Sequence, residues 1–292
     1  MPLAFLRRYG KMLIMAMEHQ PSVGPSKEIR KEKAPAYRLT KAKVAALGLL
    51  ADYFCLRVRD IAILIGKDPA DDNDRRNIQT TLSLLCKQRI ASRLPHFDCE
   101  MDLPTRSYVY GLSDRGARKF GGKTFDEHSE RTLGHELEIS AFHIALIRAY
   151  PNLRITWRQS NIKRGISPDA YFAMIDPSLP DGKNTFHFFL EIERAKIGNI
   201  KNGDPSIVRK LAHYYDYYDS NECQKAWGFR TFRVVTVVKN ADKQYNLCAR
   251  LSEYRHRMFW ITTEPLVKEK IKGEIFKTPR DFTTTAYSFF SL

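Results

Sequence analysis

Two glutamates lie within one of the most apolar segments of the chain. Residues 188–196 read FFLEIERAK, and this run of Phe, Leu and Ile is typical of a strand in the buried middle of a β-sheet. Alternate residues of a strand point to the same face, so the carboxylates of Glu191 and Glu193 should emerge side by side. An unpaired buried carboxylate is costly and two like charges repel, so we expect basic side chains or a metal ion to neutralise them.

The overall charge favours a polyanionic partner. The chain has 292 residues, which suffice for two modest domains, and its 48 Lys and Arg exceed its 33 Asp and Glu to give a formal net charge of +15. Nucleic acid is the partner that this balance indicates. No apolar run approaches the roughly 20 residues of a membrane span, so we expect no membrane insertion and a cytoplasmic location. Five scattered cysteines without a CxxC pair argue against a disulfide framework or a structural zinc site.

The first half of the chain predicts a basic arm and a small helical domain. Residues 1–38 are expected to be a flexible arm, since the stretch from 18 is rich in Pro, Ser, Lys and Glu. From Thr40 a helix is expected to run to about Tyr53, and a second short helix to stop at Gly66. A third helix is expected after the acidic loop PADDND, and its apolar stripe consists of Ile78, Leu82 and Leu85.

The polar face of this third helix resembles the recognition helix of a helix-turn-helix protein. Two alternating segments, 90–97 and 107–113, can pair as a hairpin, and a further helix starts at Ser113. This order is similar to a winged helix over residues 39–122, although any amphipathic helix has a polar face. The candidate DNA-contacting residues are Arg75, Arg76, Asn77, Gln79, Thr80, Ser83, Lys87, Arg93 and Arg106.

The second half predicts an α/β domain over residues 131–292. Polar residues 122–132 mark the boundary, and a long helix then runs to Pro151. Strands are expected at LRITWRQ, PDAYFAMI and TFHFFLEIE, followed by a helix through PSIVRKLAHYYDYYDS and a strand through TFRVVTVVKN, with further α and β units appended. The fold class is therefore α/β, or α+β for the chain as a whole.

That order of elements resembles the PD-(D/E)xK nuclease superfamily. Pro168 and Asp169 begin the middle strand, and Glu191 and Glu193 end the next one. The resemblance implies a restriction-endonuclease-like αβββαβ domain in which Asp169, Glu191 and Glu193 bind Mg²⁺ or Mn²⁺. Such a hard cation activates water and offsets the charge that develops on a phosphodiester during hydrolysis.

The sequence departs from the superfamily at the motif lysine. Glu193 stands where the common pattern has Lys, so the lysine role would fall to Lys196 or to Lys210 on the next helix, and we prefer Lys210. The alternative is that the acids pair with Arg194, Lys196 or Arg209 at a solvated strand end. Glu136 and Glu138 on the long helix lie about 200° apart, so both cannot face the site, and the choice between them stays open.

A narrower resemblance covers about residues 40–265. GHELEIS, PDAYF, FFLEIERAK and IVRKLAHYYDYY are similar to motifs of the plasmid replication-relaxation family and its MobC-type relaxase branch. In that family His135 would belong to the helix motif, beside Asp169, Glu191 and Glu193, with Lys210 and Tyr214 following. The resemblance implies an enzyme that nicks double-stranded DNA at a specific site of a plasmid or mobile element, with other relaxosome or replication proteins as possible partners.

Two functions remain open at this point. One is a metal-dependent nicking enzyme, and the other is a DNA-binding regulator or relaxosome accessory protein with an inactive nuclease fold. The run of Tyr214, Tyr215, Tyr217 and Tyr218 suggests a covalent nucleophile, but its helical spacing favours packing against the sheet. We therefore expect hydrolysis by water rather than attack by tyrosine.

Overall fold

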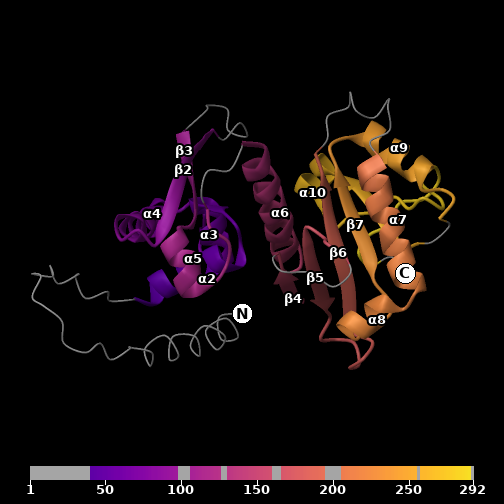
Figure 1. The fold of residues 1–292 in the computed structure, drawn as a ribbon, viewed down its shortest axis with the longest axis horizontal. Helices are drawn as coiled ribbons and strands as arrows, with labels where there is room; N and C mark the ends of the chain where they lie inside the picture. Colours follow the sequence, from indigo (N-terminus) through magenta and orange to yellow (C-terminus); the bar gives the residue numbers. More distant parts are fainter. Residues whose placement is uncertain are drawn as a thin grey trace, which may run out of the picture. The chain divides into compact units, whose positions relative to one another are not determined.

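The structure is a computed structural model that describes residues 40–97, 106–125, 130–159, 166–194, 205–254 and 257–290. Helices and strands are mixed throughout, which confirms the α/β class (Figure 1). The chain divides into two compact units, Met1–Asp126 and Glu127–Leu292. The expected basic arm over residues 1–38 lies outside the described residues. No helix of the described part is long and apolar enough to cross a membrane.

The N-terminal unit combines short helices with a small antiparallel sheet. Its elements are α2 (Lys41–Asp52), β1 (Leu56–Arg57), α3 (Val58–Leu64), α4 (Asp72–Lys87), β2 (Ala91–Phe97), β3 (Arg106–Leu112) and α5 (Asp114–Phe120). The described strands pair in the order β1-β3-β2. Two of the expected helix starts carry their caps: the Thr40 side chain accepts from Lys43 N, and the Ser113 side chain accepts from Gly116 N.

Helix α4 begins earlier than the sequence predicts. It starts at Asp72, inside the loop PADDND, because the Asp71 carboxylate accepts hydrogen bonds from Asn73 N and Asp74 N and so caps the helix. Its buried stripe is the expected one, Ile78, Leu82 and Leu85. The short strand β1, which pairs with β3 and was not expected, adds a third strand to the hairpin.

The C-terminal unit is built on a mixed sheet. Its elements are α6 (Glu130–Ala149), β4 (Arg154–Arg158), β5 (Ala170–Ile175), β6 (Thr185–Glu193), α7 (Pro205–Asp219), α8 (Glu222–Trp227), β7 (Arg233–Val238), α9 (Ala241–Arg250), β8 (Phe259–Thr263) and α10 (Glu264–Lys270). The described strands lie in the order β4-β5-β6-β7-β8. The pairs β4–β5 and β5–β6 are antiparallel, and β6–β7 and β7–β8 are parallel.

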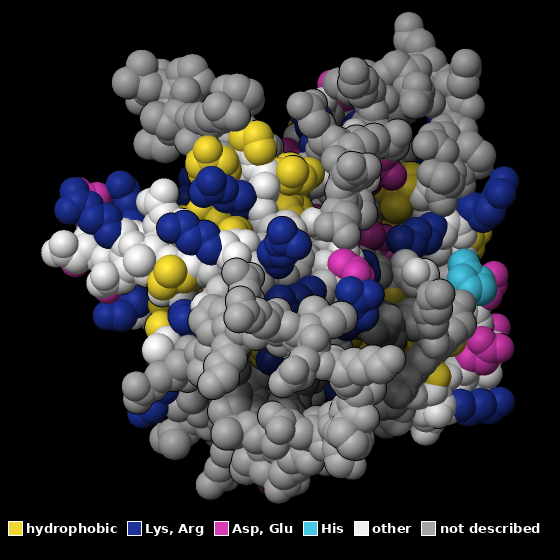
Figure 2. Space-filling view, turned by 60° about the vertical axis from the view of Figure 1, so that its left-hand side comes forward, with side chains coloured by type: hydrophobic (Ala, Val, Ile, Leu, Met, Phe, Trp, Pro, Cys, Tyr) yellow, Lys and Arg dark blue, Asp and Glu magenta, His cyan; other side chains and the backbone are white. Residues whose placement is uncertain are grey.

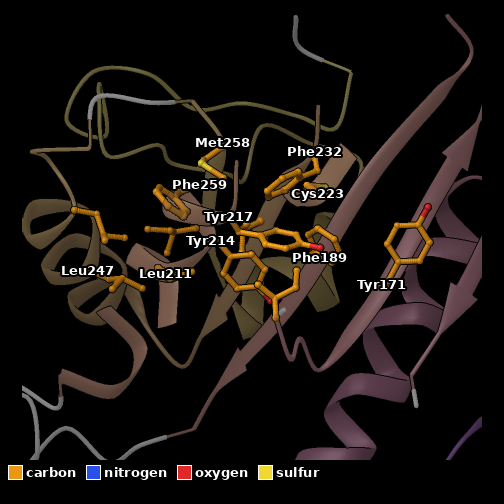
Figure 3. Packing of buried hydrophobic residues seen from close by; sticks show 14 of the residues in the cluster. Tyr171, Phe189, Leu211, Tyr214, Tyr217, Cys223, Phe232, Leu247, Met258 and Phe259 are labelled. Atoms are coloured by element: carbon orange, nitrogen blue, oxygen red, sulfur yellow. The ribbon is translucent and has the colours of Figure 1, made fainter. Parts of the chain in front are cut away.

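Two apolar layers cover the two faces of this sheet. On one face, side chains of α7, α8 and α9 pack on β5, β6, β7 and β8, and Tyr214, Phe189 and Leu211 lie within this layer (Figure 3). On the other face, α6 and α10 pack over Phe172, Phe188 and Trp260. Figure 1 shows α6 and α7 on opposite sides of the sheet. The alternation of β6 thus buries both of its faces, as a nearly continuous apolar run requires.

The C-terminal unit differs from the expectation in the start of one helix and in the presence of another. Helix α6 takes in Glu130–Thr132, part of the stretch expected to be a linker, and α8 was not expected as a separate helix. Helix α8 follows Asn221, which adopts a left-handed conformation, and it ends at Gly228 with a φ of 81°. This reversal brings Trp227 back onto Tyr171 of β5, with ring centroids 4.7 Å apart.

Candidate active site of paired carboxylates

Asp169 and Glu191 lie opposite each other on neighbouring strands. Ala170 pairs with Leu190 in the antiparallel register of β5 and β6, so the residues one step beyond are Asp169 and Glu191. The backbone N–H of Asp169 donates to Leu190 O at 3.0 Å, and Ile192 N donates to the Asp169 carboxylate at 2.7 Å. The backbone of β6 therefore fixes the first carboxylate beside the second.

Glu191 is a buried acid held by two side chains of α7. Its side chain is 2% exposed, Lys210 Nζ donates to Oε2 at 2.5 Å, and the Tyr214 hydroxyl donates to Oε1 at 2.5 Å. Burial raises the pKa of Glu191 to about 8, the charge of Asp169 adds to the rise, and Lys210 and Tyr214 oppose it. Burial thus favours the protonated form of Glu191 beside the charged Asp169.

His135 of α6 completes the other side of the pair. Its Nε2 lies 3.3 Å from Asp169 Oδ1. Burial by itself would raise the pKa of Asp169, but the hydrogen bond and charge of His135, with Lys210 and Ile192 N, hold that pKa below its usual value. Burial opposes protonation of His135, yet Asp169 and the nearby Glu136 and Glu138 raise its pKa overall. His135 and Asp169 therefore stabilise each other's charged forms.

The two acids of α6 have separate partners. Gln159, which follows β4, donates to Glu136 Oε2 at 2.6 Å, whereas Arg194, which follows β6, lies 3.1 Å from Glu138 Oε1. Neither acid has a described hydrogen bond with the Asp169–Glu191 pair. Both act on it through the charge of His135, so the structure gives neither of them the place of a third carboxylate beside the pair.

A glycine allows Arg194 to reach this helix. A Cβ on Gly134 would lie 2.3 Å from Arg194 Nη1, so a side chain at this position would displace the guanidinium. Gly134 opens the GHELEIS segment, and its role here is close approach, because it sits within α6. The glycine thus couples the start of α6 to the end of β6.

Glu193 lies two residues after Glu191 on the same face of β6, near a lysine that the sequence analysis did not predict as part of the site. Lys243 of α9 is 4% exposed; burial lowers its pKa, and the charge of Glu193 opposes this shift. A buried Lys is rare unless it is paired, so Lys243 belongs to the charged end of the sheet. The sequence feature that could have identified Lys243 is its helical spacing with Leu247, which puts it on the buried face of α9 with Gln244 and Cys248. Lys196, the other lysine candidate, lies outside the described residues.

The donor chemistry of the Asp169–Glu191 pair suits a hard divalent cation. The buried carboxyl group of Glu191 lies opposite the half-buried one of Asp169, and the pKa of Glu191 rises partly because Asp169 is charged. Among the described residues, no group of three His, Cys, Asp or Glu side chains is arranged to hold a metal ion. Asp169 and Glu191 are the residues that would hold such an ion, and no third described carboxylate is grouped with them.

Tyr214 packs in the core and also reaches the site. Its side chain is 1% exposed, and its hydroxyl is the one that donates to Glu191. Burial and the neighbouring carboxylates raise the pKa of Tyr214 well above its usual value. Tyr215 packs on Tyr254 instead, with ring centroids 5.4 Å apart. A phenol that is this hard to ionise is a poor nucleophile without a base.

The polar face of α4 lies on the surface of the N-terminal unit. Arg76, Asn77, Gln79, Thr80 and Lys87 are exposed and Ser83 is half-buried. Arg75 is also exposed but pairs with Asp72 at 2.9 Å. On the hairpin, Arg93 lies 4.7 Å above the ring of Tyr108, and the side chain of Arg106 is outside the described part. Lys and Arg side chains are scattered over the face seen in Figure 2 rather than confined to one patch.

The fold and the site define a two-unit α/β protein with a lysine-neutralised acid pair at the end of a mixed sheet. The replication-relaxation family model matches residues 47–232, which is more than half of the chain. The chain therefore belongs to the replication-relaxation family, as the sequence motifs indicated. The match includes Asp169, Glu191 and Lys210 but ends before Lys243. No curated protein and no solved structure matches the chain.

Proposed function

We propose that this protein is a site-specific DNA nicking enzyme of the MobC-type relaxase branch, acting at an origin of a plasmid or mobile element. Family membership suggests a role in plasmid replication or mobilisation. The observation that carries the nicking activity is the Asp169–Glu191 pair, with Lys210 Nζ 2.5 Å from Glu191 Oε2. Two carboxylates at adjoining strand ends and a lysine from the next helix are the side chains that metal-dependent phosphodiester hydrolysis uses.

The order of elements supports this proposal. Apart from the short helix α8 that is inserted before β7, the order α6-β4-β5-β6-α7-β7 follows the expected αβββαβ order of a PD-(D/E)xK nuclease, with the acids at the β5 start and the β6 end. In the N-terminal unit, α2, α3 and α4 followed by the β2–β3 hairpin follow the order of a winged helix. The exposed face of α4 would then read duplex DNA, and the C-terminal unit would cut it.

Each side chain of the site has a defined part in this mechanism. Asp169 and Glu191 would hold Mg²⁺ or Mn²⁺, which when bound supplies an activated water and offsets charge on the phosphate. His135 keeps Asp169 ionised through its 3.3 Å contact. Lys210 is 36% exposed, so its ammonium can leave Glu191 and pair with a DNA phosphate. Glu193, half-buried one pleat further on, is the candidate base.

A second function has its own support. All four oxygens of the central acid pair already lie near protein groups: His135 and Ile192 N at Asp169, and Tyr214 and Lys210 at Glu191. A self-neutralised network of this kind is also what an inactive nuclease fold would retain. In that case the protein is a DNA-binding regulator or an accessory protein of the relaxosome.

Relaxation of a supercoiled plasmid that carries the cognate origin separates the two functions. Wild-type protein with Mg²⁺ or Mn²⁺ should convert supercoiled to open-circular DNA, and Glu191→Gln should lose this activity while still binding the plasmid. The matched control is Asp176→Asn, a half-buried capping acid of the β5–β6 turn that contacts Ser178. Plasmid binding without relaxation in the wild type would favour the regulator.

A further inference from the structure

Strand β4 is an edge strand whose outward row is basic. In its register with β5, Arg158 lies opposite Tyr171, Thr156 opposite Ala173, and Arg154 opposite Ile175. Tyr171 and Ala173 belong to the layer under α7, α8 and α9, so the row Arg154, Thr156 and Arg158 faces that side of the sheet. The opposite row of β4, Ile155 and Trp157, packs beneath α6.

The two arginines of this row are exposed and unpaired within the described part of the chain. Arg154 and Arg158 form no ion pair there, in contrast to Arg75 and Arg118, which pair with Asp72 and Asp114 on their own helices. An edge strand is protected from aggregation by charge of any kind, and Lys is the usual choice. Arginine differs from lysine in having a planar guanidinium group, which can bind a phosphate through two hydrogen bonds.

The row leads toward the carboxylate pair. Arg158 lies close enough to Tyr171 to lower the pKa of that phenol, although burial raises it overall to about 12. Tyr171 lies two residues after Asp169, so the side chains of both residues point to the same face of the sheet. Figure 3 shows Tyr171 at the margin of the apolar layer. The row therefore begins at Arg154, passes Arg158 and ends beside the site.

Aromatic rings lie on the same face of the sheet, level with the middle of the row, because His187 pairs with Ala173 and Ala173 pairs with Thr156. Phe229 and His187 are half-buried and stack with centroids 3.7 Å apart, and the Tyr171 hydroxyl contacts His187 Nδ1 at 2.8 Å. Basic side chains that track a backbone beside stacked rings are the features of single-strand binding surfaces. A row one side chain wide, with alternate residues about 7 Å apart, can follow one DNA backbone.

We propose that Arg154, Thr156 and Arg158 bind the phosphates of one DNA strand in single-stranded form and lead it to Asp169 and Glu191. The proposal rests on the proposed function, because it names the substrate form that this same site receives. Duplex DNA would be bound by α4, and the strand to be cut would be bound by β4. The two surfaces therefore differ in the form of DNA that they prefer.

The test is the affinity of the full chain for a fluorescent oligothymidine and for a duplex of equal length, both in EDTA. Arg154→Ala and Arg158→Ala should each weaken oligothymidine binding about tenfold and lower its salt slope by about 0.7. Duplex binding should stay within about twofold of the wild type. Arg148→Ala is the matched control, since this exposed arginine lies on α6, on the opposite face of the sheet.

Three outcomes would overturn the proposal: unchanged oligothymidine affinity in both variants, an equal loss in Arg148→Ala, or an equal loss for duplex DNA. Far-UV circular dichroism and melting temperature verify the fold of each variant. Because binding is measured without metal, an inactive nuclease leaves the readout intact. If the wild type does not nick but the two arginine variants lose oligothymidine binding, the result supports the single-strand surface and rejects the nicking activity.

Discussion

Lys210 of α7 donates a 2.5 Å hydrogen bond to the carboxylate of Glu191 on β6. The lysine is 36% exposed and the glutamate 2%, so the pair joins a solvent-accessible ammonium to a buried carboxyl group. A buried carboxylate that loses its partner is strongly destabilising, so α7 is tied to the sheet through this contact. A metal ion at Glu191 would have to displace the lysine.

Removal of Asp169 should abolish metal binding without unfolding the protein. In Asp169→Ala, Glu191 would keep Lys210 but lose the second oxygen donor, so we expect Mn²⁺ binding in the wild type and none in the variant. Isothermal calorimetry at neutral pH measures this. The control Asp176→Ala removes a half-buried carboxylate of the same unit that caps the Ser178 turn away from the pair. Equal Mn²⁺ affinity in Asp169→Ala would reject the metal site.

The buried acid should make stability depend on pH, and Glu191→Gln should weaken that dependence. The pKa of Glu191 is about 8 in the folded protein against about 4.3 in an unfolded chain, so the folded state binds more protons between these values. The free energy of unfolding therefore falls as pH rises through this window, by up to about 1.4 kcal/mol per pH unit, and levels off above pH 8.

Urea denaturation at pH 5, 6, 7 and 8 measures this slope. Glu191→Gln should flatten it, while the exposed Glu253→Gln should leave it unchanged. His135, whose pKa is also raised, gives a slope of the same sign: its stabilisation is complete below about pH 6.5 and is lost as pH rises through its folded pKa. The contribution of His135 to the pH dependence of the free energy of unfolding should therefore persist in Glu191→Gln. A wild-type slope in Glu191→Gln would contradict the burial argument.

Arg76→Ala and Lys87→Ala should weaken binding of duplex DNA. Both side chains are exposed on α4, and each phosphate contact removed should lower the salt slope by about one unit. Fluorescence anisotropy over a salt series provides the measurement. Arg118→Ala is the control, because that arginine is paired with Asp114 on α5. If the α4 variants bind like the wild type, α4 contacts protein or solvent instead.

Tyr214→Phe should retain nicking and leave no protein attached to DNA. The buried phenol donates to Glu191, and its raised pKa disfavours the phenolate that covalent attack requires. The loss of that donor should lower the free energy of unfolding by about 1–3 kcal/mol. Tyr215→Phe keeps the ring that packs on Tyr254 and should also retain nicking. A denaturation-resistant DNA adduct that disappears with Tyr214→Phe would establish a tyrosine mechanism.

Gly134→Ala should impair activity more than stability. The added Cβ would lie 2.3 Å from the Arg194 guanidinium and force it away from Glu138. The arginine is flexible, and Ala favours a helix over Gly by about 1 kcal/mol, so the melting temperature should change little. Nicking should fall to the level of Arg194→Ala, with no further loss in the double variant. Full activity in Gly134→Ala would show that the arginine position is dispensable.

The sequence by itself determined the mixed α/β class and the family. It also determined the local order of elements wherever the apolar period was clear, as in the stripe Ile78, Leu82 and Leu85 of α4. Caps that depend on side chains close in sequence, such as Thr40 and Ser113, were equally readable. These features are local, so a single stretch of chain contains the information that specifies them.

The sequence already favoured Lys210 as the lysine of the site, and the structure places it on Glu191. Only the tertiary structure revealed the other charged groups: Arg194 contacts Glu138 of α6, and Lys243 comes from a helix that follows β7. Such pairings depend on strand register and on which helix covers which face, and neither is encoded in a local pattern. The sequence therefore specified two acids in a buried strand, and the packing of α6, α7 and α9 selected the groups that neutralise them.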